Sequence, residues 1–195
     1  MSATRPPLEP LRTSQRLRCL TDEQLDSLQD ATLTILENAG VRFLSETALT
    51  ILSDHGARVD KATQIVRFPR DLVRSALKTV PRYFRLGARA PEYDLQLPEG
   101  VTYFTTVGCG VETIDFETRV RRPSCKDDVG KMARIADSQP SIGFYWPMVS
   151  AQDFGRTAPL HEMDAAWSNT LKHVQSETLM GEAPCRYALE MAAVA

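Results

Sequence analysis

The chain has 195 residues, of which 43% are hydrophobic and 25% charged, and its formal net charge at pH 7 is -2. This composition is typical of a globular protein with an apolar core and excludes a largely disordered chain. The slight negative charge removes the electrostatic basis for general nucleic-acid binding.

The sequence also argues against a membrane or secreted protein. No apolar run approaches the roughly 20 residues that span a bilayer. The first residues, MSATRPPLEPLRTSQRLR, lack the apolar segment of a secretory signal. We therefore expect a cytoplasmic protein. The cysteines have no CxxC or Cys/His spacing, so we expect reduced thiols and neither a zinc site nor disulfides. They are Cys19, Cys109, Cys125 and Cys185.

The beginning of the chain divides into an arm and a helix. Prolines, arginines and little periodicity predict a flexible arm over residues 1–20. Thr21 to Gln24 then has the pattern of a capping box, and Gly40 provides a left-handed stop. The helix between them has one apolar face, formed by Leu25, Leu28, Thr32, Ile35, Leu36 and Ala39.

Shorter elements follow this helix. Ser45 is expected to cap a second helix, which Gly56 ends and in which Ala48, Ile51, Leu52 and His55 share a face. Residues 64–68 predict a brief strand, and Pro69 suits the first turn of a third helix, which ends at residues 80–81.

Residues 82–97 then predict strand-like pieces separated by a turn near residues 88–92. Everything from residue 21 to residue 100 is therefore expected to form an α-rich extension.

The sequence changes character at residue 101. Residues 102–107 are rich in β-branched and aromatic side chains and predict a strand, followed by a reversal at residues 108–110. Residues 111–122 predict a hairpin that turns outward the basic side chains of Arg119, Arg121 and Arg122, a solvated edge rather than a nucleic-acid site. Ser124 is expected to cap the amide of Asp127 in the next helix.

The remainder alternates between helical and strand-like segments. We predict a helix over residues 126–138, a strand over 142–149, a helix over 160–172, a strand over 174–180 and a helix from 184 onward. The strand IGFYWPMV is apolar at nearly every position, as expected for a strand covered on both faces. The inward stripes of the helices are Val129, Met132, Ala133 and Ala136, and then Leu160, Met163, Trp167 and Leu171.

The last helix, through Tyr187, Met191 and Val194, has no stop signal before Ala195. Three parallel strands alone would also leave an open sheet edge. We therefore expect the chain to be the front part of a longer protein.

Two stretches resemble the trimethylamine methyltransferase family: IDFETRVRRPSCKDDVGKMARIAD at residues 114–137 and NTLKHV at residues 169–174. The helix LDSLQDATLTILENAGVRF adds to the resemblance, which extends over residues 21–195. It implies an α/β fold with an N-terminal helical extension, followed by the first three βα units of a (β/α)8 TIM-type barrel. The expected domains are residues 1–20, 21–100 and 101–195.

The resemblance also implies a reaction. A methyl group passes from a methylated amine, such as trimethylamine or glycine betaine, to cobalt(I) of a corrinoid carried by a partner protein, and the demethylated amine is released. No cofactor is expected to bind this chain directly. Some members of the family carry pyrrolysine in a later part of the barrel, and the sequence leaves open which kind this chain is and whether it forms a homo-oligomer.

In such a barrel the site lies at the carboxyl ends of the strands, here residues 108–110, 147–153 and 178–182. A methylammonium group needs aromatic faces and a balancing carboxylate. Glu177 is the carboxylate candidate, with an exposed position beyond the strand as the alternative. The aromatic candidates, for which core packing is the alternative, are Tyr103, Phe104, Tyr145 and Trp146.

Other reactive residues are expected to be structural. Lys172 and His173 stand at the amino-terminal face, where they would satisfy the last carbonyl groups of a helix. Cys109 has no base at an interpretable spacing, and His55 and His161 lie on helices. The sequence assigns no catalytic residue and no metal ligand.

Two other functions stay open at this point. The chain could be a truncated, non-catalytic fragment, as the missing helix stop suggests. It could also belong to a (β/α)8 enzyme of another specificity, since this fold hosts many chemistries.

Overall fold

A computed structural model of the chain describes residues 5–12, 18–97, 100–108 and 110–195. The chain forms two compact units, one of Gln15–Arg82 and one of Met1–Ser14 with Tyr83–Ala195. The domain limits inferred from the sequence stay a prediction.

The unit of residues 15–82 begins with α1 (Asp22–Asn38), whose capping box is confirmed. The Gln24 amide donates to Thr21 Oγ1 (3.3 Å), and the Thr21 amide donates to Gln24 Oε1 (2.9 Å). Both bonds satisfy amides that the first turn of a helix leaves unpaired. Gly40 follows the helix with φ of 78°, as expected of a left-handed stop.

The predicted apolar face of α1 is largely exposed within this unit, and Leu33, outside the prediction, is buried. The reason is the ion pair with α3 (Arg70–Thr79). Arg70 donates to Glu37 (3.2 Å) and Thr34 (2.5 Å) and pairs with Asp30, so α3 is held to a polar side of α1. Periodicity alone does not reveal such a contact.

The core of this unit lies between α2 (Glu46–Asp54) and a small antiparallel sheet. The sheet has the order β2-β4-β3, with β2 at Val41–Arg42, β4 at Ile65–Arg67 and β3 at Arg58–Asp60. Only β4 was predicted, because strands this short leave no clear alternation in the sequence. The predicted cap is confirmed: Ser45 Oγ accepts the Ala48 amide at 3.3 Å. The buried residues are Leu49, Ala57 and Val66.

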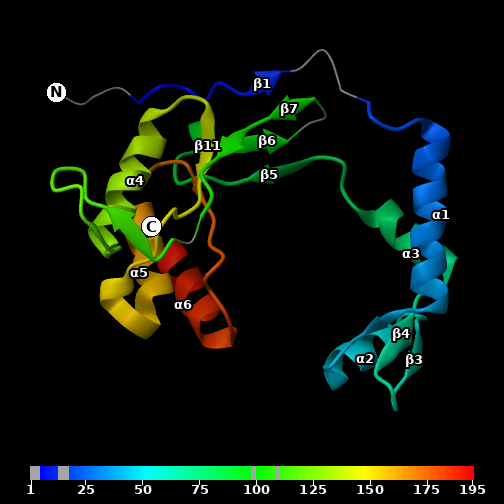
Figure 1. Ribbon diagram of the computed structural model, residues 1–195. Helices are drawn as coiled ribbons and strands as arrows, with labels where there is room; N and C mark the ends of the chain where they lie inside the picture. The colour runs from blue at the N-terminus through cyan, green and yellow to red at the C-terminus, as the bar shows by residue number, and fades with distance from the viewer. Residues whose placement is uncertain (1–4, 13–17, 98–99, 109) are drawn as a thin grey trace. The chain divides into compact units, whose positions relative to one another are not determined.

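In the other unit, two short antiparallel pairs precede the parallel strands (Figure 1). They join β5 (Phe84–Leu86) to β6 (Leu95–Leu97) around the 3-10 turn η1 (Pro91–Tyr93), as predicted, and β1 (Leu11–Arg12) to β7 (Val101–Thr102). Part of the predicted arm is therefore paired. The Glu9 amide also donates to Pro140 O at 2.9 Å.

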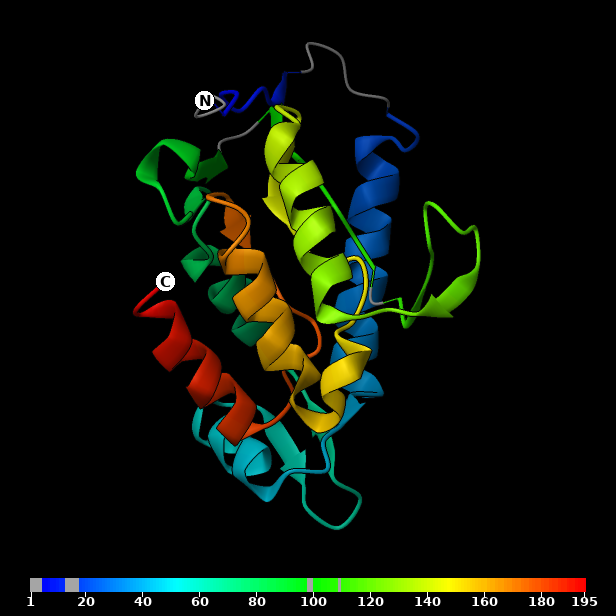
Figure 2. The ribbon, with the colours of Figure 1, turned by 90° about the vertical axis from the view of Figure 1, so that its left-hand side faces the viewer.

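Three parallel strands form the centre of this unit: β8 (Phe104–Thr105), β11 (Ile142–Tyr145) and β12 (His173–Val174), in the order β12-β11-β8. They alternate with α4, α5 and α6, which Figure 2 shows side by side. The bounds of these helices are Lys126–Ser138, Ala158–Trp167 and Glu182–Ala192. The predicted βα rhythm is confirmed. The described residues form no closed barrel, so the barrel stays a prediction.

Several element ends differ from the prediction. β11 stops at Tyr145 rather than at residue 149, since Pro147 has no amide to donate. Pro159 in the first turn lets α5 begin at Ala158, two residues early, and the helix ends at Trp167. α6 ends at Ala192 and does not continue to the last residue. The predicted strand over 174–180 is reduced to β12.

The predicted hairpin is confirmed as β9 (Glu112–Ile114) and β10 (Arg121–Pro123). Two details around it are corrected. Arg122 does not point outward, because it pairs with Asp128 at 2.7 Å. Ser124 does not cap α4: it is buried, and its Oγ donates to Ser150 O at 2.7 Å.

The core of this unit lies between the sheet and the two helices α4 and α5. The predicted stripe of α4 is confirmed by the burial of Val129, Ala133 and Ala136. In α5 the prediction was partly wrong, because Ala165 and Ala166 fill the core while Trp167 is only half-buried. Small side chains allow the two helices to approach closely, which a search for large apolar residues misses.

Gly143 in β11 permits the closest packing on this sheet, since a Cβ there would lie 2.8 Å from Tyr103 Cβ. We expect Gly143→Ala to lower the free energy of unfolding by about 1–3 kcal/mol, the usual cost of overpacking. Urea unfolding followed by circular dichroism measures this change. Gly87→Ala is the matched control, because the nearest atom to its new Cβ is 4.0 Å away. Equal effects of the two substitutions would contradict the prediction.

Candidate functional site

A narrow cleft lies where β11 and β12 end, at the carboxyl edge of the parallel sheet, and in this structure it is too tight to hold a molecule the size of water. It is lined by Trp146, Pro147, Val149, Glu162, Ser176, Glu177 and Thr178. The parallel register places Tyr145 opposite Val174, and the Gln175 amide extends the ladder by donating to Tyr145 O at 3.0 Å. Two of the predicted site residues, Trp146 and Glu177, therefore meet at the same end of the sheet.

Thr106 fixes the backbone of Trp146 just beyond the last strand residues. Its Oγ1 accepts the Trp146 amide at 2.8 Å and donates to the Trp146 carbonyl at 2.7 Å. The side chain thus replaces ladder bonds where β8 has ended. Within the part of the chain that the structure describes, the buried indole Nε1 of Trp146 has no acceptor. A buried donor without an acceptor is uncommon and is available to a further group.

Glu162 on α5 is the functional candidate that the sequence prediction missed. It is 2% exposed, and its Oε1 accepts from Ser150 Oγ (2.5 Å) and from the Ala151 amide (3.3 Å). Its Oε2 accepts from Thr178 Oγ1 at 2.6 Å. The only sequence signal is a carboxylate next to the inward residue Met163, which does not by itself distinguish a buried position from a solvated one.

The two predicted tyrosines lie away from the cleft. Tyr145 is fully buried among the core residues, and its hydroxyl donates to Val129 O at 3.0 Å. Burial raises the pKa of Tyr145 to about 12. Tyr103 lies against Gly143 at the start of β8. Both placements favour core packing, the alternative that the sequence left open. Phe104 is exposed.

Lys172 occupies the opposite, amino-terminal edge of the sheet. Its Nζ donates to the carbonyl oxygens of Ala136 (2.8 Å), Gln139 (2.7 Å) and Ile142 (2.7 Å). The contacts fit the predicted structural role, but the helix that it caps is α4 rather than α5. Burial lowers the pKa of Lys172, and the charge of Asp137 opposes this effect.

The histidines have local structural contacts. His173 Nδ1 lies 2.6 Å from Gly87 O, and His55 Nδ1 lies 2.7 Å from Ile51 O on an exposed helix end. His161 stacks on Phe154 with ring centroids 3.5 Å apart, and its Nδ1 lies 3.2 Å from Lys126 Nζ. None of these histidines lines the cleft.

The cysteines that the structure describes are free thiols: Cys19 and Cys185 are exposed and Cys125 is partly buried. Cys109 lies outside the described residues. In the described ranges no group of His, Cys, Asp and Glu side chains could hold a metal ion. No described helix combines the length and apolarity needed to cross a membrane.

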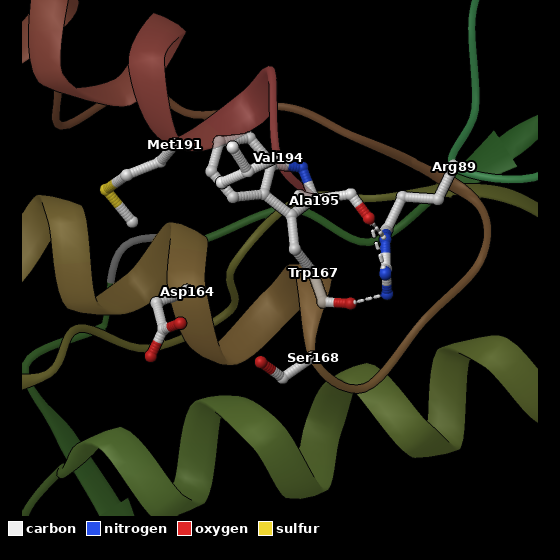
Figure 3. A pocket seen from close by; sticks show the side chains of 7 residues that line it. All are labelled: Arg89, Asp164, Trp167, Ser168, Met191, Val194 and Ala195. Atoms are coloured by element: carbon white, nitrogen blue, oxygen red, sulfur yellow. Dashed lines mark hydrogen bonds between the residues drawn. The ribbon is translucent and has the colours of Figure 1, made fainter.

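A second hollow lies between α5 and α6, beside the end of each helix (Figure 3). It is lined by Arg89, Asp164, Trp167, Ser168, Met191, Val194 and Ala195. Arg89 Nε and Nη2 donate to Ala195 O at 2.9 and 2.6 Å, and Nη1 donates to Trp167 O. The guanidinium group therefore holds the ends of two helices, a structural use of a cation.

The family model for trimethylamine methyltransferase (MTTB) matches residues 3–177. The chain belongs to this family. It is 34% identical over 155 residues to trimethylamine methyltransferase MttB of Desulfitobacterium hafniense. The aligned residues make up 79% of this chain and 31% of that protein.

Two further relatives extend the comparison. The chain is 32% identical over 171 residues to MttB2 of Methanosarcina mazei, covering 85% of this chain and 34% of that protein. It is 32% identical over 127 residues to a proline betaine:corrinoid methyltransferase of Eubacterium limosum, covering 64% of this chain and 25% of that protein. The chain thus spans about a third of the length of the two MttB proteins.

The segment that carries the family resemblance folds as the hairpin followed by α4. Arg122 joins these two elements: its Nη1 and Nη2 donate to the two carboxylate oxygens of Asp128 at 2.7 and 2.9 Å. Asp128 also accepts the Cys125 amide at 3.0 Å. The bond from Arg122 holds the pKa of Asp128 well below its usual range, against the opposing effect of burial. The hairpin is thereby fixed at the carboxyl edge of the sheet.

We expect Asp128→Asn to lower the free energy of unfolding at neutral pH by about 1–3 kcal/mol, because the charged hydrogen bonds to Arg122 are lost. The folded pKa of Asp128 lies below the value of about 3.9 found in unfolded chains. Its stabilising contribution is therefore complete above that pH and is lost as the pH falls toward the folded pKa.

Urea titrations between about pH 2 and pH 7 measure the free energy of unfolding of wild type and variant. We expect the difference between the two free energies to become smaller as the pH falls. Asp127→Asn is the control, since Asp127 is exposed and pairs with Lys131 on the helix surface. The prediction would be contradicted if the difference in unfolding free energy between wild type and Asp128→Asn stayed constant down to the lowest pH.

Proposed function

We propose that the complete protein transfers a methyl group from a methylated amine to the cobalt of a corrinoid carried by a separate protein. Family membership and the names of the relatives support this reaction class. The observation within the chain that carries the proposal is the cleft at the carboxyl edge of the sheet, which combines an indole ring with a carboxylate.

The fold that we propose for the complete protein is a (β/α)8 barrel. The described strands β8, β11 and β12 are parallel, adjacent and in chain order, and each is followed by a helix, α4, α5 and α6 in turn. This is the arrangement from which such barrels are built. In barrel enzymes the carboxyl edge of the strands carries the active site, and the cleft lies at that edge.

The two side chains suit a methylated ammonium group. Its charge is spread over methyl groups, which an aromatic face stabilises by about 0.5–2 kcal/mol per ring. Trp146 would supply that face, and the exposed Glu177 would balance the charge. In the transfer the bond between nitrogen and methyl carbon breaks, the methyl group forms a bond to cobalt, and the electron pair stays on the released amine.

The direct test is methyl transfer by the purified protein, expressed from its complete reading frame and mixed with its corrinoid protein in the cobalt(I) state. We expect addition of trimethylamine or a quaternary amine to remove the cobalt(I) absorbance and to release one demethylated amine for each methyl group transferred. Omission of the amine is the control. Absence of transfer from every methylated amine offered, with an active corrinoid partner, would refute the proposal.

The role of the indole makes a separate prediction. We expect Trp146→Leu to raise KM for the amine by about 2- to 30-fold, the equivalent of one lost cation–π contact of about 0.5–2 kcal/mol. Initial rates of methyl transfer at varied amine concentration measure this change. Trp167→Leu, on the half-buried tryptophan beside the second hollow, is the matched control. An unchanged KM in Trp146→Leu, or an equal rise in Trp167→Leu, would remove Trp146 from the binding site.

A further inference from the structure

Glu162 is a buried carboxylate whose hydrogen-bond partners come from two different loops. Ser150 and Ala151 belong to the segment after β11, and Thr178 belongs to the segment after β12. We infer that Glu162 is a positioning residue, which holds these two loops at a fixed distance and thereby sets the geometry of the cleft between Trp146 and Glu177. The inference rests on the proposed function only for the identity of the cleft as the amine site.

The contacts indicate that the carboxylate is charged. The hydroxyl groups of Ser150 and Thr178 lie 2.5 and 2.6 Å from its oxygens. Such short distances are characteristic of hydroxyl groups that donate to an ionised carboxylate. Among the described residues Glu162 has no ion pair. The hydrogen bonds from these three donors therefore offset the free-energy cost of burying the carboxylate. Oε1 has two donors and Oε2 has one, so loss of the Thr178 hydroxyl group leaves the buried Oε2 without a donor.

The segment after β11 is also joined to the segment after β8. The Ser150 amide donates to Gly110 O at 2.8 Å, and Ser124 Oγ donates to Ser150 O. The segments after β8 and β11 are thus already connected through backbone groups. The segment after β12 begins with the bond from the Gln175 amide to Tyr145 O, and three residues later the bond from Thr178 to Glu162 connects it to α5 and the segment after β11. Thr178 directly follows the proposed amine-binding residue Glu177. Removing that single bond should free Glu177 while the other connections persist.

Thr178→Val is the sharpest test, because it removes the hydroxyl group and keeps the shape of the side chain. In the 195-residue chain carrying Trp167→Phe, Trp146 is the one remaining indole. We expect Thr178→Val to shift its emission to longer wavelength and to increase quenching by acrylamide, since the loop beside it opens to water. Thr178→Ser, which retains a hydroxyl donor, should leave both measurements unchanged.

Substitutions of Glu162 itself provide the second arm. Glu162→Gln can still accept from the Ala151 amide and donate to Thr178 Oγ1, so it should preserve the emission of Trp146, whereas Glu162→Ala should shift it. Glu190→Ala, an exposed carboxylate on α6, is the control. If Glu162→Ala does not fold, Thr178→Val decides the matter alone. A folded Thr178→Val chain with unchanged emission and quenching would overturn the inference.

Activity separates this inference from the proposed function. In the complete protein with its corrinoid partner, we expect Thr178→Val to raise KM for the amine about tenfold with little change in kcat, and Thr178→Ser to restore it. If Thr178 had a purely structural role, Thr178→Val would lower the midpoint of unfolding without raising KM relative to kcat. If wild type transfers no methyl group but the emission responds, the proposed function fails and the positioning role stands. If wild type is active and the emission does not respond, the positioning role fails.

Discussion

The parallel register of β8, β11 and β12 is the constraint on which the rest of the larger unit depends. These strands are only two to four residues long, so their ladder alone provides few hydrogen bonds. Parallel strands also require crossover segments, and here α4 and α5 supply both the connections and the covering layer. The alanines of the two helices and Gly143 allow close packing that keeps the strands in register.

Buried charges of opposite sign hold the two edges of this sheet. Lys172 binds three carbonyl groups at the amino-terminal edge, and Glu162 binds two hydroxyl groups and an amide at the carboxyl edge. Each charge is satisfied by neutral partners rather than by an ion of opposite sign. Such partners are fixed in direction, so each charge determines the positions of the segments that it joins. The cleft of Trp146 and Glu177 lies at the Glu162 edge. The hollow between α5 and α6 also combines an indole, Trp167, with a carboxylate, Asp164, but there Arg89 already occupies the helix ends.

The chain belongs to the trimethylamine methyltransferase family and spans about a third of the length of the curated relatives named above, and the chemistry of this edge is our proposal. The part described here contributes one side of the proposed site: an indole, an exposed carboxylate and the loops that carry them. The ion pair between Arg122 and Asp128 fixes the hairpin at the same edge. The connections after β11 and β12 line the cleft, and the connection after β8 is joined to the one after β11 through Gly110 and Ser124.

Local signals in the sequence were sufficient to predict α4 from Lys126 to Ser138, the capping box at Thr21 and the hairpin, because helix caps and turns depend on residues within a few positions of one another. The roles of Trp146 and Glu177 stay predictions, and Glu177 takes the exposed position beyond the end of β12 that the sequence left open as an alternative. The burial of Glu162, the core position of Tyr145 and the inward turn of Arg122 were decided by the tertiary structure. Glu162 and Tyr145 depend on partners 12 to 16 residues away, which a one-dimensional pattern does not contain. Arg122 pairs with Asp128 only six residues on, but that contact requires the hairpin to fold back on the start of α4.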